Sequence, residues 1–195
     1  MEIKHIVFYA NCQYAGFQYF LKEIWPNATY VNFYNWNMLD LKQEIPVEDL
    51  QKADLFIYQP IKKEHGKYST DPEVENNFLS HLRDDCIKVS FPYIYNSGAK
   101  QAGQIDKVVG GWDGTKTFDE CLVIMEEREK TTDIHFSGFI RHHNAKHKLF
   151  LTQNHPTAPI YVHGANQLMK ILGRKERWDA FGEFNLREVC DGQYG

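Results

Sequence analysis

The stretch that decides the fold is IVFYANCQYAGFQ, residues 6–18. Its first half is a short apolar run that ends at polar residues, which predicts a buried β-strand. From Gln13 to about Glu23 the apolar residues recur instead at helical spacing. Asn11, Cys12 and Gln13 are therefore expected to form the turn that leads directly from a first strand into a first helix.

This position has chemical consequences for Cys12. Ligands of open α/β sheets bind at the carboxyl ends of the strands, so the turn would lie on the functional edge. The N–H groups at a helix N-terminus favour a thiolate over a thiol, and other folds place a reactive Ser or Cys on a strand-to-helix turn. The alternative is that Cys12 is a small buried hydrophobe, as most cysteines outside disulfides are.

The composition is typical of a globular protein. The 195 residues suffice for a single α/β domain, residues 1–195, with a substantial core. A net charge of −4 indicates no nucleic-acid partner, and no apolar run has the length of a membrane span. The N-terminus lacks the basic and apolar regions of a signal peptide, so a cytoplasmic location is expected. The four cysteines form no C-x-x-C pair, which argues against a disulfide framework and a structural zinc site.

Predicted strands and helices alternate along the rest of the chain. Strands are expected at 28–34, 54–58 and 86–91, with a last strand or extended segment at 148–152. A helix start is expected at 46–50, and helices are expected at about 72–83, 117–130, from 131 onward and 160–172. The glycine-rich stretch 96–117 has no nucleotide-binding glycine pattern and is interpreted as a functional loop. The alternation predicts a three-layer α/β sandwich with a mostly parallel sheet.

Two groups of polar residues could assist Cys12. A cysteine nucleophile needs a base, and His155 is a candidate because it follows the predicted last strand and precedes a helix. The alternative is that His155 only caps a backbone group. Asn11, Gln13 and Gln59 lie at the ends of the first and third predicted strands, where their amides could donate hydrogen bonds to an oxyanion beside Cys12. Singly, each of these amides is more often a turn residue.

Two further clusters are less specific. His143 and His147 are four residues apart, with His142 adjacent, but no carboxylate or cysteine stands at ligand spacing, so no metal site is predicted. A set of basic residues in the last third of the chain could meet phosphates, or could be a solvated helix face. This set consists of Arg141, Lys146, Lys148, Lys170, Arg174, Lys175 and Arg177.

Four short sequence motifs along the chain carry a resemblance to a known family. They are Asn11-Cys12-Gln13, Tyr58-Gln59-Pro60, Phe91-Pro92-Tyr93 and LFLTQNHPT at residues 149–157. Together they resemble the WcbI-like polysaccharide-biosynthesis family over residues 6 to about 173. The resemblance implies a link to capsule polysaccharide biosynthesis, binding of coenzyme A and acetylation of sugars. It also implies a flavodoxin-like fold similar to that of the SGNH hydrolases.

By this resemblance, Cys12 takes the place of the SGNH serine and His155 that of the base. Tyr93 and Asn154 then join Asn11, Gln13 and Gln59 as residues around the substrate. Thr152 stands three residues before His155, where SGNH enzymes carry an acid, so the residue that orients the imidazole is not identified.

The expected function is transfer of an acetyl group from acetyl-CoA to a sugar or polysaccharide precursor. One alternative is an esterase or thioesterase that uses the same residues. The other is a non-catalytic domain that binds CoA or carbohydrate. The sequence leaves the oligomeric state open.

Overall fold

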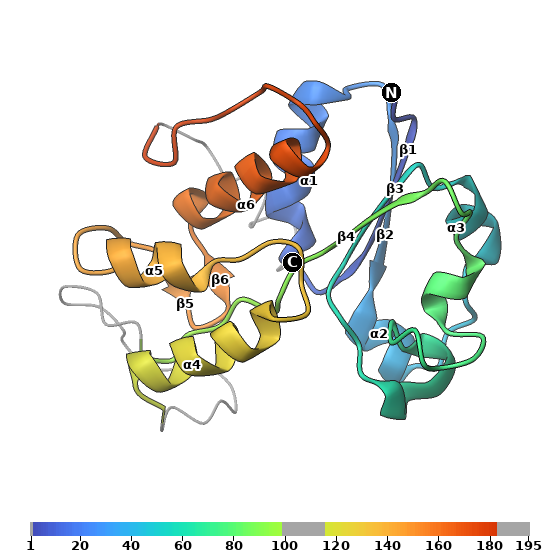
Figure 1. Ribbon diagram of the computed structural model, residues 1–195, viewed down its shortest axis with the longest axis horizontal. Coiled ribbons are helices and arrows are strands. Elements are labelled where there is room, and N and C mark those ends of the chain that lie inside the picture. Colours follow the sequence, from blue (N-terminus) through green and yellow to red (C-terminus); the bar gives the residue numbers. More distant parts are fainter. Residues whose placement is uncertain (1, 99–115, 183–195) are drawn as a thin grey trace. The chain divides into compact units, whose positions relative to one another are not determined.

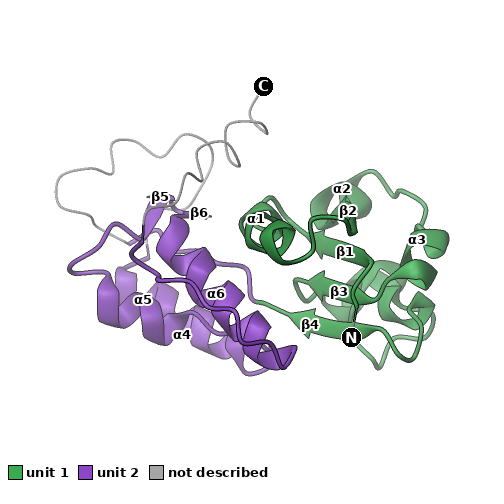
Figure 2. Cartoon of the chain, turned by 90° about the horizontal axis from the view of Figure 1, so that it is seen from above, with its two compact units in different colours: residues 1–91 green, residues 92–195 purple. Residues whose placement is uncertain are grey.

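The computed structural model describes residues 2–98 and 116–182 (Figure 1). Most of the glycine-rich stretch predicted to be a functional loop lies outside the described residues. The chain divides into two compact units, residues 1–91 and 92–195 (Figure 2). A single domain over residues 1–195 stays a prediction.

Unit 1 is built on a four-stranded sheet with the strand order β2-β1-β3-β4. The strands are β1 (His5–Ala10), β2 (Thr29–Tyr34), β3 (Leu55–Tyr58) and β4 (Ile87–Ser90). Every pairing in this sheet is parallel; Val7, for example, pairs with Val31 on one side and with Phe56 on the other. Strand β1 is fully buried from Ile6 to Ala10, as a strand covered on both faces should be.

Side chains that alternate along β1 build a layer on each face of the sheet. On one face, Val7, Tyr9 and Phe56 share a core with helices α2 (Asn35–Asp40) and α3 (Val47–Lys52) and the 3-10 helices η1 (Lys63–Tyr68) and η2 (Phe78–His81). On the other face, Phe8 contacts Tyr14 of α1 (Tyr14–Ile24), with ring centroids 5.5 Å apart. Figure 1 shows α1 on one side of the sheet and α2 and α3 on the other. The predicted three-layer α/β fold with a parallel sheet is confirmed.

The described part of unit 2, residues 92–98 and 116–182, contains three helices and a short hairpin. The helices are α4 (Phe118–Glu129), α5 (Ser137–His143) and α6 (Ala158–Ile171), and the hairpin strands are β5 (Phe150–Thr152) and β6 (His155–Pro156). Thr117 and Glu120 form a capping box that starts α4. Pro159 lies in the first turn of α6, and Gly173 ends that helix with a positive φ of 66°. These boundaries agree with the predicted helices at 117–130 and 160–172.

The helix predicted at 72–83 is wrong. Side chains there bind nearby backbone groups, which competes with helix formation. The Asp71 carboxylate accepts from the Glu73 N–H at 2.9 Å, and the Asn77 side chain accepts from the Ser80 N–H at 2.9 Å. Asn76 adopts a positive φ of 53°, which interrupts any helix between these two turns. Only the short η2 helix forms.

His155 follows a strand and precedes a helix, as predicted, but that strand does not belong to the four-stranded sheet. The segment at 148–152 contributes β5, which pairs antiparallel with β6 in a separate two-stranded sheet. Thr152 and His155 are direct partners across this hairpin. The helix expected from residue 131 begins later, at Ser137, because the buried carboxylate of Glu129 accepts hydrogen bonds from the Phe136 and Ser137 N–H groups at 2.5 and 2.8 Å.

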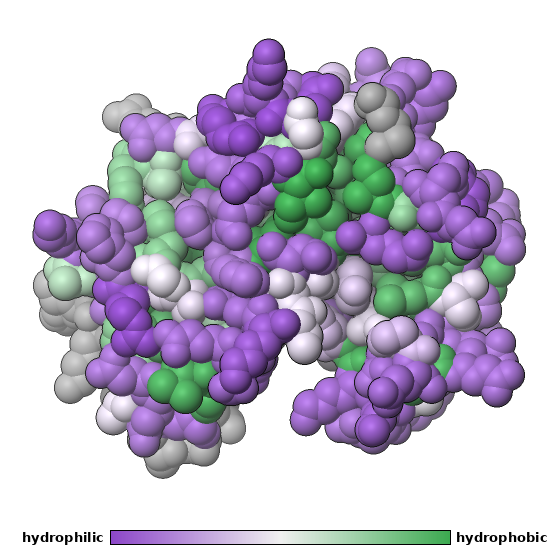
Figure 3. All heavy atoms as spheres, viewed as in Figure 1, coloured by the Kyte–Doolittle hydropathy of each residue, from purple (hydrophilic) through white to green (hydrophobic). Residues whose placement is uncertain are grey.

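Polar residues cover most of the face shown in Figure 3. Within residues 2–98 and 116–182, no helix has the length and apolar character needed to cross a membrane.

Candidate functional site

The strand order of unit 1 locates a candidate site at the carboxyl ends of β1 and β3. The chain passes from β1 to β2 on one side, and then to β3 on the other side of β1, so the direction of winding reverses between β1 and β3. Ligands of open α/β sheets bind in the crevice outside such a switch point. Asn11 follows the last residue of β1 and Gln59 follows the last residue of β3. The fold therefore brings these two predicted residues to the same edge.

Gln59 connects the segments at this edge through its buried amide. Its Oε1 accepts from the backbone N–H of Asn11 at 2.9 Å and from Nδ2 of Asn35 at 3.3 Å. Its Nε2 donates to Oε1 of Gln13 at 2.9 Å. Gln13 and Gln59 are 0% and 3% exposed, so these bonds form where water competes little. Gln59 thus ties the end of β3 to the turn after β1 and to the end of β2.

The turn that carries Cys12 is also held from within. Oδ1 of Asn11 accepts from the Gln13 N–H at 3.0 Å, and the carbonyl of Asn11 accepts from the Tyr14 N–H at 3.2 Å. The amides of Asn11, Gln13 and Gln59 are therefore directed at one another and at the turn. These contacts fix the backbone on both sides of Cys12. The role of these amides as oxyanion donors stays a prediction.

Cys12 lies two residues before the first residue of α1 and is half-buried. Cys86 and Cys121 are buried, and burial raises the pKa of the Cys86 thiol to about 11. Cys190 lies outside the described residues. Among the cysteines that the structure describes, Cys12 combines partial exposure with a place at the N-terminus of a long helix, the environment that favours a reactive thiolate.

His155 lies in unit 2, on the hairpin β5–β6, in close contact with Thr152. The Thr152 hydroxyl is hydrogen-bonded to Nδ1 of His155, and it donates to Oδ1 of Asn154 at 3.2 Å. Burial lowers the pKa of His155 below its ordinary value. The turn between the strands is anchored at Gln153, whose Oε1 accepts from the Tyr95 hydroxyl at 2.9 Å. Cys12 and His155 belong to different units, and their pairing stays a prediction.

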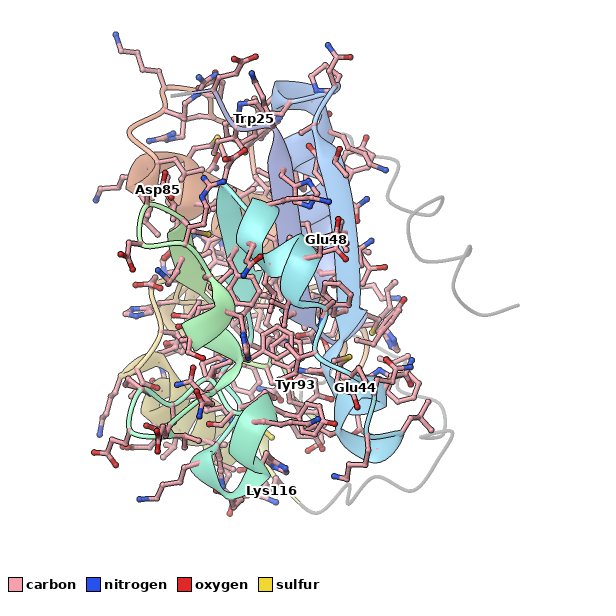
Figure 4. All side chains as sticks on the ribbon, turned by 90° about the vertical axis from the view of Figure 1, so that its right-hand side faces the viewer. Trp25, Glu44, Glu48, Asp85, Tyr93 and Lys116 are labelled. Atoms are coloured by element: carbon pink, nitrogen blue, oxygen red, sulfur yellow. The ribbon has the colours of Figure 1, made fainter. Side chains whose placement is uncertain are left out.

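Tyr93, labelled in Figure 4, lies near the start of unit 2. The guanidinium of Arg128 lies 5.6 Å from the centre of its ring, and Nη1 of Arg128 donates to the Tyr93 carbonyl at 3.2 Å. The ring also stacks on Tyr95, with centroids 6.1 Å apart. The contacts described for Tyr93 hold the segment after β4 against α4 through a cation–π interaction.

Sequence reasoning missed Asn35 and the role of Thr152. Asn35 follows β2 directly, so the rule that drew attention to Asn11 and Gln59, a polar residue after a parallel strand, also applied to it. For Thr152, the sequence indicates only that the residue three positions before His155 is not an acid. Its bond to the imidazole depends on the hairpin pairing, which the sequence pattern did not predict.

The histidine cluster is packed against aromatic rings in unit 2. The ring centroids of His143 and His147 are 5.9 Å apart, and His147 stacks on Phe181 at 3.9 Å. Among the described residues, no group of three or more His, Cys, Asp or Glu side chains is placed to hold a metal ion.

The predicted basic set is partly neutralised by neighbouring acids. Arg141 pairs with Glu126 at 2.6 Å and with Asp119 at 3.3 Å, and Arg174 pairs with Glu176. The set is therefore less available to a phosphate-bearing ligand than the sequence suggests.

Comparisons with known proteins give a sequence match and a structural match. Residues 5–99 match the model of the family described as "Polysaccharide biosynthesis enzyme WcbI". No curated protein matches the sequence. A solved structure of WcbI has a TM-score of 0.64 to this chain at 18% identity, covering 93% of this chain and 74% of that one.

That solved structure is described as a novel polysaccharide biosynthesis enzyme, in its native form without a disulfide bond between CoA and a cysteine of that protein. The predicted likeness to SGNH hydrolases stays a prediction. The chain is therefore similar in sequence to the WcbI family of polysaccharide biosynthesis enzymes over residues 5–99, and it shares the fold of a WcbI structure over most of its length.

Proposed function

We propose that the protein is a CoA-dependent acyltransferase of the WcbI family, which transfers an acetyl group from acetyl-CoA to a sugar hydroxyl in capsule or other polysaccharide biosynthesis. One observation carries the proposal: Cys12 lies at the switch point of a parallel sheet, on a turn that Gln59 holds in place. The solved WcbI structure adds support because its description concerns CoA and a cysteine of that protein.

The proposed chemistry starts at the thioester carbonyl of acetyl-CoA. The Cys12 thiolate attacks this carbon, the C–S bond to CoA breaks, and the departing CoA sulfur takes up a proton. An acetyl-cysteine results. The sugar hydroxyl then attacks the acetyl carbon while a base removes its proton, and the Cys12 thiolate is restored. In the second possible route the sugar hydroxyl attacks acetyl-CoA directly, and Cys12 only shapes the pocket.

His155 is the proposed base in either route. Its neutral form is required to accept a proton, so activity should fall as pH drops through the pKa of the imidazole. Because burial lowers this pKa below the ordinary value, activity should persist to a more acidic pH than an exposed histidine would allow. A pH–rate profile of the acetyl transfer measures this directly.

The substitution His155→Asn tests the base. Turnover should fall by roughly two orders of magnitude, the usual contribution of a positioned acid–base group, while CoA binding persists. Undiminished turnover in a folded His155→Asn protein contradicts the mechanism. Equal losses of CoA binding, stability and turnover would indicate a structural role instead.

Incubation with acetyl-CoA, with and without candidate sugars, separates the proposal from its alternatives. Release of CoA that depends on the sugar indicates transfer. Release without a sugar indicates a thioesterase. Binding without release indicates a non-catalytic CoA-binding domain, an alternative favoured by Thr152, which stands three residues before His155 where SGNH enzymes carry an acid. Intact-protein mass spectrometry after acetyl-CoA alone tests whether Cys12 carries an acetyl group.

A thermal-shift titration tests CoA binding apart from chemistry. A ligand that binds only the native state raises the melting temperature as its concentration rises. CoA and acetyl-CoA are both expected to do so. Flat titrations with both would contradict CoA as a ligand of this chain.

A further inference from the structure

On the hairpin β5–β6, the Thr152 hydroxyl lies between the amide oxygen of Asn154 and the imidazole of His155, and either group can accept a hydrogen bond from it. Thr152 and His155 face each other directly across the hairpin, and Asn154 lies in the turn between them. The Thr152 Oγ1 contacts both Nδ1 of His155 and Oδ1 of Asn154. A threonine hydroxyl has one proton to donate and lone pairs to accept with. The two contacts therefore have different directions.

Which group donates in each of these two hydrogen bonds follows from the single proton of the Thr152 hydroxyl. Oδ1 of Asn154 is an acceptor only, so the Thr152 hydroxyl proton must point toward it. The hydroxyl then has no proton left for the imidazole, and its bond to Nδ1 requires that Nδ1 donate. A neutral imidazole with its proton on Nδ1 carries its lone pair on Nε2.

The backbone around the hydroxyl supports a fixed geometry. At the turn, the Gln153 carbonyl accepts from the Asn96 N–H at 2.8 Å and its side chain accepts from the Tyr95 hydroxyl. At the open end, the Thr157 N–H donates to the Leu149 carbonyl at 2.9 Å. Hydrogen bonds therefore hold the backbone at both ends of the hairpin, and this fixes the relative position of Thr152 and His155.

We infer that Thr152 is the positioning residue of His155: its hydroxyl accepts from Nδ1–H, donates to Oδ1 of Asn154, and so makes Nε2 the basic nitrogen. Thr152 thus stands in the place that an acid holds in other histidine-dependent sites, but it sets the tautomer without adding a charge. The neutral Thr152 hydroxyl stabilises an imidazolium less than a carboxylate would, which is compatible with a histidine that stays neutral near pH 7.

Nitrogen-15 NMR of the histidine side chains tests the tautomer without reference to activity. Spectra of protein with labelled histidines, recorded above the pKa of the ring, distinguish Nδ1–H from Nε2–H, and the His155→Asn spectrum identifies the signals of His155. The wild-type ring is expected to be mainly in the Nδ1–H form. A ring that is mainly in the Nε2–H form overturns the inference.

Variants at two threonines separate the hydroxyl from the hairpin as a whole. Thr152→Val removes the hydroxyl at an exposed position and should shift the tautomer ratio toward Nε2–H by roughly two- to tenfold, the effect of one neutral hydrogen bond. Thr152→Ser should keep the wild-type ratio. Thr157→Val is the matched control, because the Thr157 hydroxyl donates to the Lys148 carbonyl in the same hairpin. A ratio unchanged in Thr152→Val, or changed equally in Thr152→Ser or Thr157→Val, overturns the inference.

The consequence for catalysis rests on the proposed function and has its own readout. If His155 is the base, Thr152→Val should lower kcat while leaving the Kd for CoA unchanged, and Thr152→Ser should restore kcat. A shifted tautomer together with an unchanged kcat would contradict His155 as the base, while the positioning role of Thr152 would stand on the NMR result.

Discussion

Replacing Gln59 with methionine should destabilise unit 1 far more than a single surface substitution does. Methionine has a similar length but no hydrogen-bonding amide, so Gln59→Met removes the hydrogen bonds that Gln59 makes to the Asn11 N–H, to Nδ2 of Asn35 and to Oε1 of Gln13. A buried polar group without its partner costs about 1–3 kcal/mol. Gln13 is fully buried, whereas Asn11 is half-buried and can recover water. The expected loss in the free energy of unfolding is therefore about 2–4 kcal/mol.

Urea unfolding of unit 1 measures this loss. Trp25 and Trp36 lie in unit 1, so their fluorescence reports on it once Trp112 and Trp178 are replaced by phenylalanine. The midpoint should fall while the dependence on urea stays the same, because the surface exposed on unfolding hardly changes. A loss below about 1 kcal/mol for Gln59→Met would refute the reasoning, since it would mean that water or local rearrangement satisfies the groups that Gln59 binds.

Two further variants give the prediction its controls. In unit 2, Gln167→Met removes an amide that bridges the backbone N–H and carbonyl of His135 at the surface, where water can replace it. It should cost less than about 1 kcal/mol, measured in protein that keeps Trp112 and Trp178 and has Trp25 and Trp36 replaced by phenylalanine. Gln13→Met combined with Gln59→Met removes both partners of the buried pair. The double variant should lose less than the sum of the two single variants by roughly 1–3 kcal/mol.

Two other predictions follow from burial and from close packing. Cys12 should react with iodoacetamide faster than Cys86 or Cys121 at neutral pH, because Cys12 is half-buried at a helix N-terminus while the other two cysteines are buried. Time-resolved peptide mapping by mass spectrometry of ligand-free protein measures the three rates, and equal rates contradict a reactive Cys12. Gly98→Ala should lower the melting temperature by several degrees, because the new Cβ would lie 2.1 Å from a backbone nitrogen. Gly138→Ala in α5, where the new Cβ has nothing within 4 Å, should leave the melting temperature unchanged or raise it, and similar shifts in the two variants would contradict this packing.

The parallel sheet of unit 1 was predictable from the sequence because its signals are local. Strands β1, β3 and β4 are short apolar runs that end at a polar residue or a proline, and α1 has apolar residues at helical spacing. The grouping of Asn11 and Gln59 followed from a general property of parallel sheets, that their carboxyl ends share an edge. The strand order, which decides that β1 and β3 are neighbours, was not in the local pattern.

The hairpin β5–β6 could not be predicted in the same way. Its apolar run, residues 149–151, looks like a further strand of the main sheet, and nothing in its composition distinguishes parallel pairing with distant strands from antiparallel pairing with the next few residues. The failed helix at 72–83 has a similar cause. Asp71 and Pro72 give a genuine helix-start signal, but Asn76 and Asn77 form turns that stop it after a few residues.

The sequence separation within the Gln59 network has a consequence for how the protein is made. The bonds from Gln59 to Asn11 and Gln13 span 48 and 46 residues. A helix such as α1 can form as soon as it leaves the ribosome, but contacts between distant residues must wait for the intervening chain and pay its loop entropy. The nascent Cys12 turn thus lacks its partner until β3 has emerged and paired. A thiol probe applied to stalled chains of increasing length would follow this late step in the maturation of the N-terminal unit.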